Sequence, residues 1–123
     1  MEGKRGGEVA FPISAALLDA VVLAIVAREG TYGYKITQDV RQVIEVSEST
    51  LYPVLRRLLK DGSLSTYDQV MAGRVRRYYQ ITPAGEEKLR GYRKDWIGYR
   101  DSIERVLGEN EAAQARPEEE EKA

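Results

Sequence analysis

The hydrophobic period of this chain changes at Gly62, and this change limits its possible folds more than any other feature. Before Gly62, apolar residues recur at the three- and four-residue spacing of amphipathic helices. After it come two short stretches, residues 64–70 and 74–82, that are rich in β-forming residues. Met71-Ala72-Gly73 joins the two stretches, a pattern that predicts a β-hairpin. We therefore expect helices followed by a two-stranded wing.

Three helices are expected before the hairpin. The first spans about residues 13–28 and is apolar on nearly every side, which favours burial against both its own domain and a second subunit. The second spans roughly residues 33–44 and has one apolar stripe. The third starts near Ser47 or Ser49, either of which can cap it, and ends at Gly62.

A longer helix is expected to begin at Thr82-Pro83, with threonine as the N-cap and proline at the first position. Its apolar residues follow alternating steps of three and four, which form an a/d heptad seam. The seam consists of Leu89, Tyr92, Trp96, Tyr99, Ile103 and Val106. A seam of this kind needs a partner helix, so we expect a dimer interface. The residues expected to form it are Leu89, Trp96, Ile103 and Val106.

The residue inventory excludes most enzyme chemistry. The chain has no cysteine and no histidine, so it lacks a thiol nucleophile, a disulfide framework, and the commonest general base and metal ligand. Glu86 and Glu87 are adjacent on a helix and point in different directions, so they do not form a catalytic carboxylate pair. We expect no enzyme activity, no cofactor and no metal site.

The longest apolar run, residues 15–27, is broken only by Asp19. It is too short to span a bilayer, which favours a buried core helix. Arg28-Glu29-Gly30 follows the run where a signal peptide would have a small-residue cleavage site. We therefore expect a cytoplasmic protein that has no membrane partner.

The net charge of −1 conceals opposite charges in two parts of the chain. Residues 56–93 hold nine Lys or Arg against four acids, a local charge of +5. Residues 109–123 hold six Glu against two basic residues, a local charge of −4. The basic middle favours nucleic-acid binding, with a merely solvated basic face as the alternative. For the acidic tail a solubilising role is expected, with DNA mimicry or contact with a partner as the alternatives.

Two helices joined by a short turn and followed by a wing are typical of a winged helix-turn-helix, whose recognition helix puts its N-terminal residues against the bases of the major groove. Hydroxyls and arginines can contact phosphates and bases there. The residues expected to bind DNA are Lys35, Ser47, Ser49, Thr50, Tyr52, Arg56, Arg57, Arg74 and Arg76. Packing between helices is the alternative for Tyr52. Strand alternation can turn Arg77 away from DNA when Arg76 faces it.

A chain of 123 residues has room for one domain with a modest core. The expected fold is mainly α with a small β-hairpin, a winged helix-turn-helix plus a long C-terminal dimerisation helix. We divide the chain into a flexible segment (1–12), the DNA-binding domain (13–82), the dimerisation helix (83–108) and an acidic, disordered tail (109–123).

Three linked motifs resemble those of the PadR family of transcriptional regulators. The second helix begins like theirs with Tyr32-Gly33-Tyr34-Lys35-Ile36. The recognition helix is similar over Thr50-Leu51-Tyr52-Pro53-Val54-Leu55-Arg56-Arg57-Leu58 and the following Asp61-Gly62. The wing and the start of the last helix are similar over Gly73-Arg74-Val75-Arg76-Arg77-Tyr78-Tyr79-Gln80-Ile81-Thr82-Pro83-Ala84-Gly85. The resemblance covers about residues 13–107 and is closest to the short subgroup that lacks a separate C-terminal domain.

The resemblance implies a homodimer joined by the last and first helices, bound to a pseudo-palindromic double-stranded DNA operator and repressing nearby genes. It also implies relief by a small hydrophobic or aromatic effector, because some members enclose a flat hydrophobic pore lined by tryptophan. Trp96 lies on the corresponding helix, and Tyr92, Tyr99 and Ala16 are weaker candidates for the same site. Simple interface packing is the alternative for Trp96. A protein-interaction module that dimerises without binding DNA is the alternative function.

Overall fold

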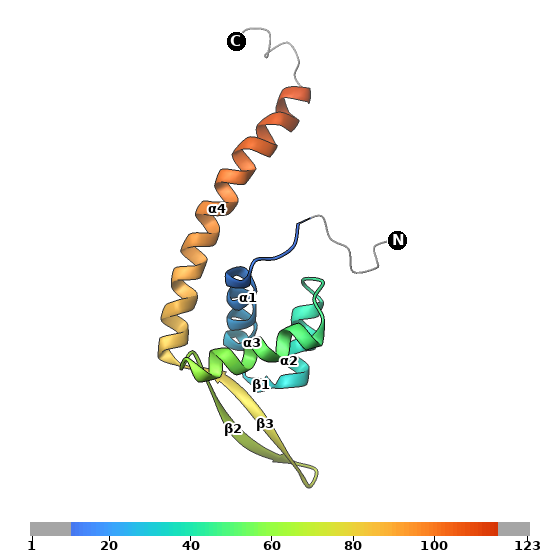
Figure 1. Cartoon of the computed structure of the whole chain (residues 1–123), viewed down its shortest axis with the longest axis vertical. Helices are drawn as coiled ribbons and strands as arrows, with labels where there is room; N and C mark the ends of the chain where they lie inside the picture. Colours follow the sequence, from blue (N-terminus) through green and yellow to red (C-terminus); the bar gives the residue numbers. More distant parts are fainter. Residues whose placement is uncertain (1–10, 116–123) are drawn as a thin grey trace. The chain divides into compact units, whose positions relative to one another are not determined.

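The computed structural model describes residues 11–115, with side chains described as far as Gly108. Within them the protein is mainly α-helical with one small antiparallel sheet, so the predicted fold class is confirmed (Figure 1). The elements are α1 (Ala15–Arg28), β1 (Thr31–Tyr32), α2 (Gly33–Arg41), α3 (Glu48–Lys60), β2 (Leu64–Met71), β3 (Arg74–Ile81) and α4 (Pro83–Ala115). Most of the predicted flexible segment, and the tail beyond Ala115, lie outside the described residues.

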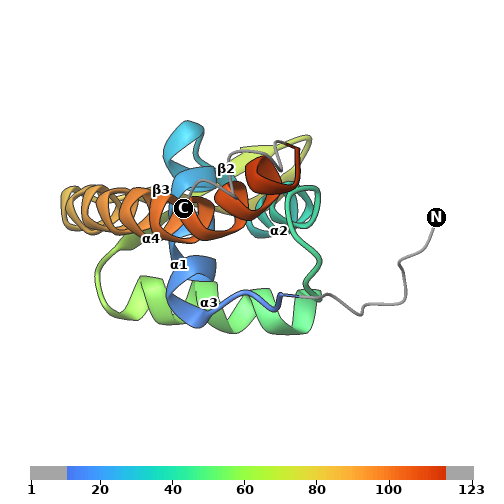
Figure 2. The same ribbon diagram turned by 90° about the horizontal axis from the view of Figure 1, so that it is seen from above.

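The chain divides after Tyr92 into two compact units. The first unit has one core, built around α1 because that helix is apolar on nearly every side. Figure 2 shows α3 on one side of α1. The core residues are Leu18, Val22, Leu23, Ile25, Val26, Ile36, Val40, Leu51, Val54, Leu55, Leu58, Leu64 and Leu89.

The turn between α2 and α3 is longer than the sequence predicted. Helix α2 ends at Arg41, and the N–H groups of Val43 and Ile44 both donate to the carbonyl oxygen of Val40 in a tightened last turn. Ser47 is the N-cap of α3, because its hydroxyl accepts a hydrogen bond from the N–H of Thr50 at 3.2 Å. The cap fixes where α3 begins, and therefore which residues lie in its exposed first turn.

The sheet has a third strand that the sequence analysis missed. Strand β1 pairs antiparallel with β3, in the order β1-β3-β2, and aligns Tyr32 with Tyr78. It has only two residues, too few to produce a period-2 pattern. The chain approaches β3 closely just before this strand, because a Cβ added at Gly30 would lie 2.9 Å from the carbonyl oxygen of Tyr79. Strand β1 thus joins the base of the wing to the start of α2.

The predicted hairpin is confirmed, with Met71 aligned with Arg74 across its turn. The two residues between them, Ala72 and Gly73, have φ angles of 53° and 76°. Positive φ at both central residues is the backbone of a type I′ turn, which matches the twist of the strands. Glycine adopts this backbone freely, whereas alanine is strained in it.

Replacing Ala72 with Asn is expected to raise the free energy of unfolding by about 0.5–1 kcal/mol, because asparagine tolerates positive φ and Asn-Gly is a preferred type I′ pair. Urea unfolding followed by circular dichroism measures the change. Ala72→Val is the matched control and should lower stability, since a β-branched side chain is disfavoured at positive φ. An Asn variant no more stable than the wild type would contradict the prediction.

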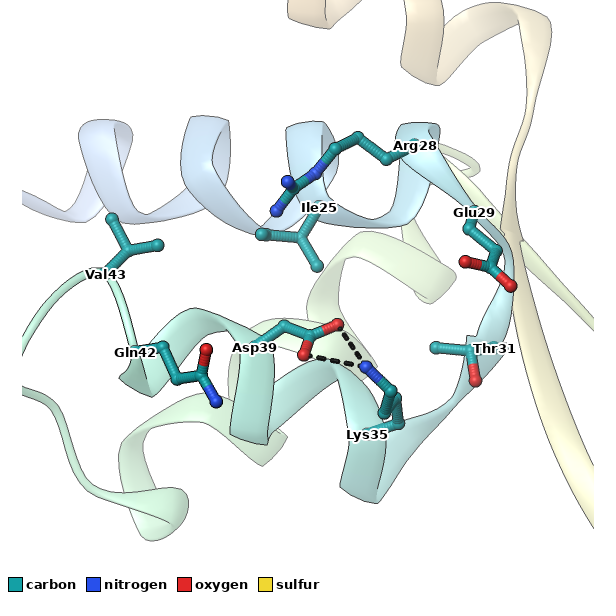
Figure 3. Close-up of a pocket in the computed structure, with 8 residues that line it drawn as sticks. All are labelled: Ile25, Arg28, Glu29, Thr31, Lys35, Asp39, Gln42 and Val43. Carbon is teal, nitrogen blue, oxygen red and sulfur yellow. Dashed lines mark hydrogen bonds and ion pairs between the residues drawn. The ribbon is translucent and has the colours of Figure 1, made fainter.

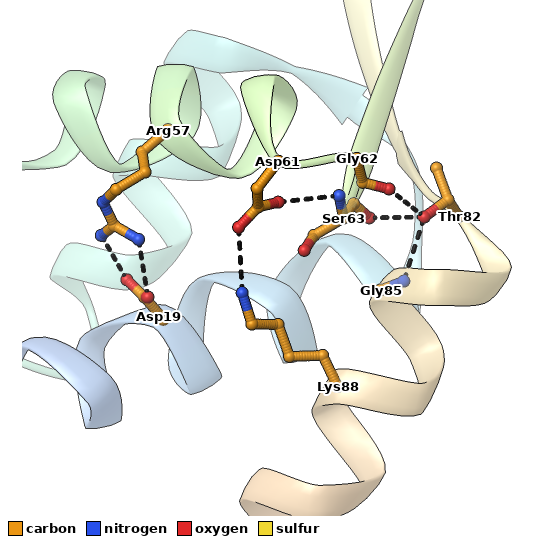
Figure 4. Close-up of polar contacts among 8 residues, drawn as sticks. All are labelled: Asp19, Arg57, Asp61, Gly62, Ser63, Thr82, Gly85 and Lys88. Carbon is orange, nitrogen blue, oxygen red and sulfur yellow. Dashed lines mark hydrogen bonds and ion pairs between the residues drawn. The ribbon is translucent and has the colours of Figure 1, made fainter.

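Helix α4 begins as predicted and ends later than predicted. The Thr82 hydroxyl lies 2.6 Å from the carbonyl oxygen of Gly62, to which it donates, and accepts from the N–H of Gly85 (Figure 4). The helix then continues to Ala115, past the expected end at Gly108. A glycine inside a helix costs only about 1 kcal/mol relative to alanine. The alanines and glutamates beyond it favour helix, so Gly108 does not end α4.

Candidate nucleic-acid interface

Helix α3 has one buried and one exposed face. Leu51, Val54, Leu55 and Leu58 are all less than 10 % exposed and anchor the helix in the core. The opposite face is exposed and carries Ser49, Thr50, Pro53, Arg56 and Lys60. This face is open to solvent along the whole length of the helix.

The N-terminal end of that face is a cluster of hydroxyl groups. The Ser47 hydroxyl lies 3.0 Å from the hydroxyls of both Ser49 and Thr50. All three residues are exposed, as their predicted role requires. Ser47 is already engaged as the N-cap, which leaves Ser49 and Thr50 as the freer donors toward a phosphate or a base.

Tyr52 lies at the side of this face. It is half-buried and packs against the core, and its ring lies beside Gly33 at the start of α2. Most of the Tyr52 ring therefore packs between helices, which is the alternative given for this residue. Its remaining exposed part borders the α2 N-terminus.

Arg57 is turned away from the exposed face. Its guanidinium donates two hydrogen bonds to the Asp19 carboxylate on α1, at 2.7 and 2.8 Å (Figure 4). The Asp19 side chain is 8 % exposed, against 49 % for Arg57. The hydrogen bonds to Asp19 raise the pKa of Arg57. This arginine therefore neutralises a buried carboxylate, and its predicted contact with DNA stays a prediction.

A second ion pair lies nearby and ties the end of α3 to the first turns of α4. Lys88 donates to Asp61 at 2.9 Å, and Asp61 also accepts from the N–H of Ser63 (Figure 4). Burial alone would raise the pKa of Asp61, but the hydrogen bonds from Ser63 and Lys88 outweigh it and lower that pKa to about 2. The two ion pairs link α3 to α1 through Arg57 and Asp19, and the end of α3 to the start of α4 through Asp61 and Lys88.

Replacing Arg57 with Ala is expected to lower the free energy of unfolding by about 2 kcal/mol, because the Asp19 carboxylate stays buried without a partner. The loss is smaller than the roughly 3–5 kcal/mol of a fully buried pair, since the Arg57 guanidinium is half exposed. Urea unfolding measures it. Arg56→Ala, one residue away on the exposed face, is the control and should change stability by less than about 0.5 kcal/mol. Equal losses in the two variants would contradict this assignment.

Lys35 is exposed on α2 but is not free. Its ammonium donates to both carboxylate oxygens of Asp39, at 2.9 and 3.1 Å, and this hydrogen bonding raises the pKa of Lys35. The pair lines a groove of about 490 Å³ beside the end of α1 (Figure 3). Contact with a phosphate would have to compete with Asp39, and the DNA-binding role of Lys35 stays a prediction.

The wing presents its arginines on two faces. Side chains alternate along β3, so Arg74 and Arg76 lie on one face and Arg77 lies on the other with the core residues Tyr79 and Ile81. All three arginines are exposed. The Arg76 guanidinium carbon lies 4.3 Å from the centre of the Tyr32 ring. The register thus groups Arg74 with Arg76, as expected, and separates both from Arg77.

The residues expected at the dimer seam fall into two groups. Leu89 is 3 % exposed and belongs to the core of the first unit, so it is not available to a second subunit. Tyr92 packs against the same core. In the second unit, the exposed seam residues are Trp96, Tyr99, Ile103 and Val106, with exposed fractions of 40, 64, 45 and 58 %.

The residues expected at the effector site are only partly brought together. The rings of Trp96 and Tyr99 are neighbours on α4, with centroids 6.3 Å apart. Tyr92 is half-buried in the first unit, and Ala16 is exposed in the first turn of α1. The groove beside Lys35 is lined by none of these four residues.

Two further findings concern residues 11–115. No group of three or more acidic, histidine or cysteine side chains there could hold a metal ion. No helix in that part of the chain has both the length and the hydropathy needed to cross a membrane.

An exposed helix that begins with hydroxyls and carries Arg56, next to a basic β-hairpin, defines the winged helix-turn-helix class of transcriptional regulators. The chain belongs to the PadR-like family of that class, whose family model matches residues 22–91.

The chain is also similar to proteins of known sequence. An uncharacterized protein X from Lysinibacillus sphaericus is 32 % identical over 92 residues, which are 71 % of this chain and 84 % of that protein. Transcriptional regulator Rv3488 of Mycobacterium tuberculosis is 42 % identical over 69 residues, 55 % of this chain and 64 % of its own.

Among solved structures, smu.1704 from Streptococcus mutans is 41 % identical, with a TM-score of 0.75 over 81 % of this chain and 94 % of its own. The PadR-like regulator BC4206 from Bacillus cereus is 28 % identical, with a TM-score of 0.69 over 74 % of this chain and 91 % of its own. Family membership makes this protein a transcriptional regulator and gives no indication of an enzyme.

Proposed function

We propose that the protein is a homodimeric, sequence-specific DNA-binding repressor that acts in the cytoplasm. The observation that carries the proposal is the exposed face of α3, where hydroxyls at the helix start are followed one turn later by Arg56. In this fold such a face enters the major groove. Arg74 and Arg76, together on one face of the wing, add a basic surface for the backbone or the neighbouring minor groove.

Dimerisation is supported by the exposed apolar seam of α4. Four residues in steps of three and four leave about half of each side chain uncovered, which a single helix in water does not favour. A two-fold dimer would present two copies of α3 to a pseudo-palindromic operator, with half-sites about one helical turn of DNA apart. Bound upstream of a gene, such a dimer would repress it.

The proposal is tested by fluorescence anisotropy with labelled DNA from the promoter that precedes the protein's own gene. Saturable binding that is at least about 1,000-fold tighter than to random DNA, and that weakens steeply as salt rises, is the expected result. Equal, weak affinity for both DNAs, together with a stable dimer in solution, would instead favour an interaction module that does not bind DNA.

We further propose that a small hydrophobic or aromatic effector relieves repression by binding near Trp96 and Tyr99. The two rings form an exposed aromatic pair on a helix that would lie at the dimer interface. An effector would act by binding more tightly to the dimer whose α3 helices are wrongly spaced for the operator.

Trp96 is the only tryptophan, so its fluorescence reports this site directly. A panel of planar aromatic compounds is titrated into the protein and into the preformed operator complex. Quenching of Trp96 by a compound that also releases the DNA supports the effector. If no compound does both, Trp96 does not mark an effector site, and the proposal that the protein binds DNA is unaffected.

A further inference from the structure

Three tyrosines and one arginine form a continuous stack on the outer face of the sheet. Tyr32 comes from β1, Tyr67 from β2, and Tyr78 and Arg76 from β3. The Tyr78 ring lies 5.7 Å from that of Tyr32, edge to face, and 5.5 Å from that of Tyr67. The Arg76 guanidinium carbon lies 4.3 Å from the centre of the Tyr32 ring. The stack therefore runs across all three strands and ends in a positive charge.

The strand register places these groups on the face that does not contribute to the core. Tyr79 and Ile81 point from β3 into the core, so Arg76 and Tyr78 point the other way. Tyr67 is 39 % exposed, and Tyr32 and Tyr78 are half-buried. This face of the sheet covers no part of the hydrophobic core, so core packing does not account for three tyrosines on it.

Contact with Tyr32 restricts Arg76 without using up its hydrogen-bond donors. Arginine stacks through the flat face of its guanidinium, which leaves the N–H groups at the edge free to bind a phosphate. Arg76 forms no ion pair with any residue of the described chain, in contrast to Arg57, which is held by Asp19. A stacked arginine loses less conformational freedom on binding than one that moves freely.

The position of the stack indicates which part of DNA it faces. Arg76 lies two residues, about 7 Å, from Arg74 toward the base of the wing. Its stacking partner Tyr32 directly precedes α2, whose N-terminal N–H groups also favour a phosphate. A residue between the wing tip and a helix N-terminus is well placed for the sugar-phosphate backbone.

We propose that Tyr32 is a positioning residue that orders Arg76 to grip an operator phosphate, with Tyr78 and Tyr67 bracing the ring. The inference rests on the proposed DNA-binding function. It gives a role to Tyr32, which the sequence placed only in a family motif. It also assigns Arg76 to the DNA backbone and not to the bases.

A double-mutant cycle in operator affinity tests the inference, with the variants Tyr32→Phe, Tyr32→Leu, Arg76→Ala and Tyr32→Leu/Arg76→Ala. Tyr32→Phe keeps the ring and should stay within about twofold of the wild type. Tyr32→Leu should lower the affinity about fivefold for each subunit that contacts DNA. In the Arg76→Ala background, Tyr32→Leu should lower the operator affinity no further, because the group that Tyr32 positions is gone.

Salt dependence gives a second readout that a purely structural role would not move. Arg76→Ala should reduce the slope of log affinity against log salt by about 0.9 for each phosphate that the variant no longer neutralises, and Tyr32→Leu should reduce it in the same direction. Thermal unfolding of each variant checks that the fold is retained.

The outcomes are separable from those of the proposed function. If Tyr32→Leu lowers operator affinity by the same factor in the Arg76→Ala background as in the wild type, the inference is overturned. It is also overturned if Tyr32→Phe binds as weakly as Tyr32→Leu, because the hydroxyl itself would then contact DNA. Wild-type affinity in Arg76→Ala also overturns it and leaves the repressor proposal standing. Failure of the wild type to prefer its operator would remove the proposed function itself.

Discussion

Replacing Arg56 and Arg74 together with Ala is expected to weaken operator binding about 1,000-fold. Each arginine that binds a base or a phosphate contributes roughly 1–3 kcal/mol, and a homodimer loses four of them. Even at the lower end the loss is about 4 kcal/mol, close to three factors of ten in the dissociation constant. Anisotropy titrations at fixed salt measure the loss, and the salt slope should fall as well.

The matched control removes the same charge elsewhere. Arg90 and Arg100 are exposed on α4 and pair with Glu87 and Asp101. The Arg90→Ala/Arg100→Ala variant should bind the operator within about threefold of the wild type if position, and not net charge, decides affinity. Similar losses in both double variants would mean that DNA is held by general attraction, without the α3 face.

Replacing Ile103 with Glu is expected to raise the dissociation constant of the dimer at least about 100-fold, because each subunit would bury an unpaired carboxylate in an apolar seam. Ile103 is 45 % exposed in the isolated chain, so the first unit should keep its fold. Analytical ultracentrifugation over a concentration series measures the change. Operator affinity should fall with it, since a monomer contacts one half-site.

Arg105→Glu is the control for this variant. Residue 105 lies about 200° from residue 103 around the helix, away from the seam. The substitution changes the charge by two units, whereas Ile103→Glu changes it by one. If charge alone governed association, the control would dissociate more. A dimer unaffected by Ile103→Glu would place the interface elsewhere.

The parts of the fold that have a strong local period were predictable from the sequence. The helical spacing in α1 and α3, the β-rich stretches around Ala72-Gly73 and the Thr82-Pro83 start of α4 all agree with the structure. Each depends on residues within a few positions of one another. The exposed face of α3, with Ser49, Thr50 and Arg56, follows from the same local pattern.

The missed strand and the misplaced end of α4 have different causes. Strand β1 is too short for a periodic signal, and its pairing with β3 is set by residues far along the chain. Gly108 is a helix-ending residue in many sequences, yet the segment after it favours helix enough for α4 to continue. For α4, one residue type was a weak guide because its neighbours decided the outcome.

The sequence by itself determined the order of the helices and the hairpin, the fold class, the basic middle of the chain and the family motifs. Tertiary structure decided which of several similar residues are free to act. Arg57 differs from Arg56 only because Asp19, 38 residues earlier, lies on the helix against which Arg57 packs. Leu89 lies on the predicted seam but is buried in the core of the first unit. Arg76 contacts the Tyr32 ring because β1 pairs with β3. A pattern in sequence reports the face on which a side chain lies, whereas its partner depends on packing between segments that are distant in the chain.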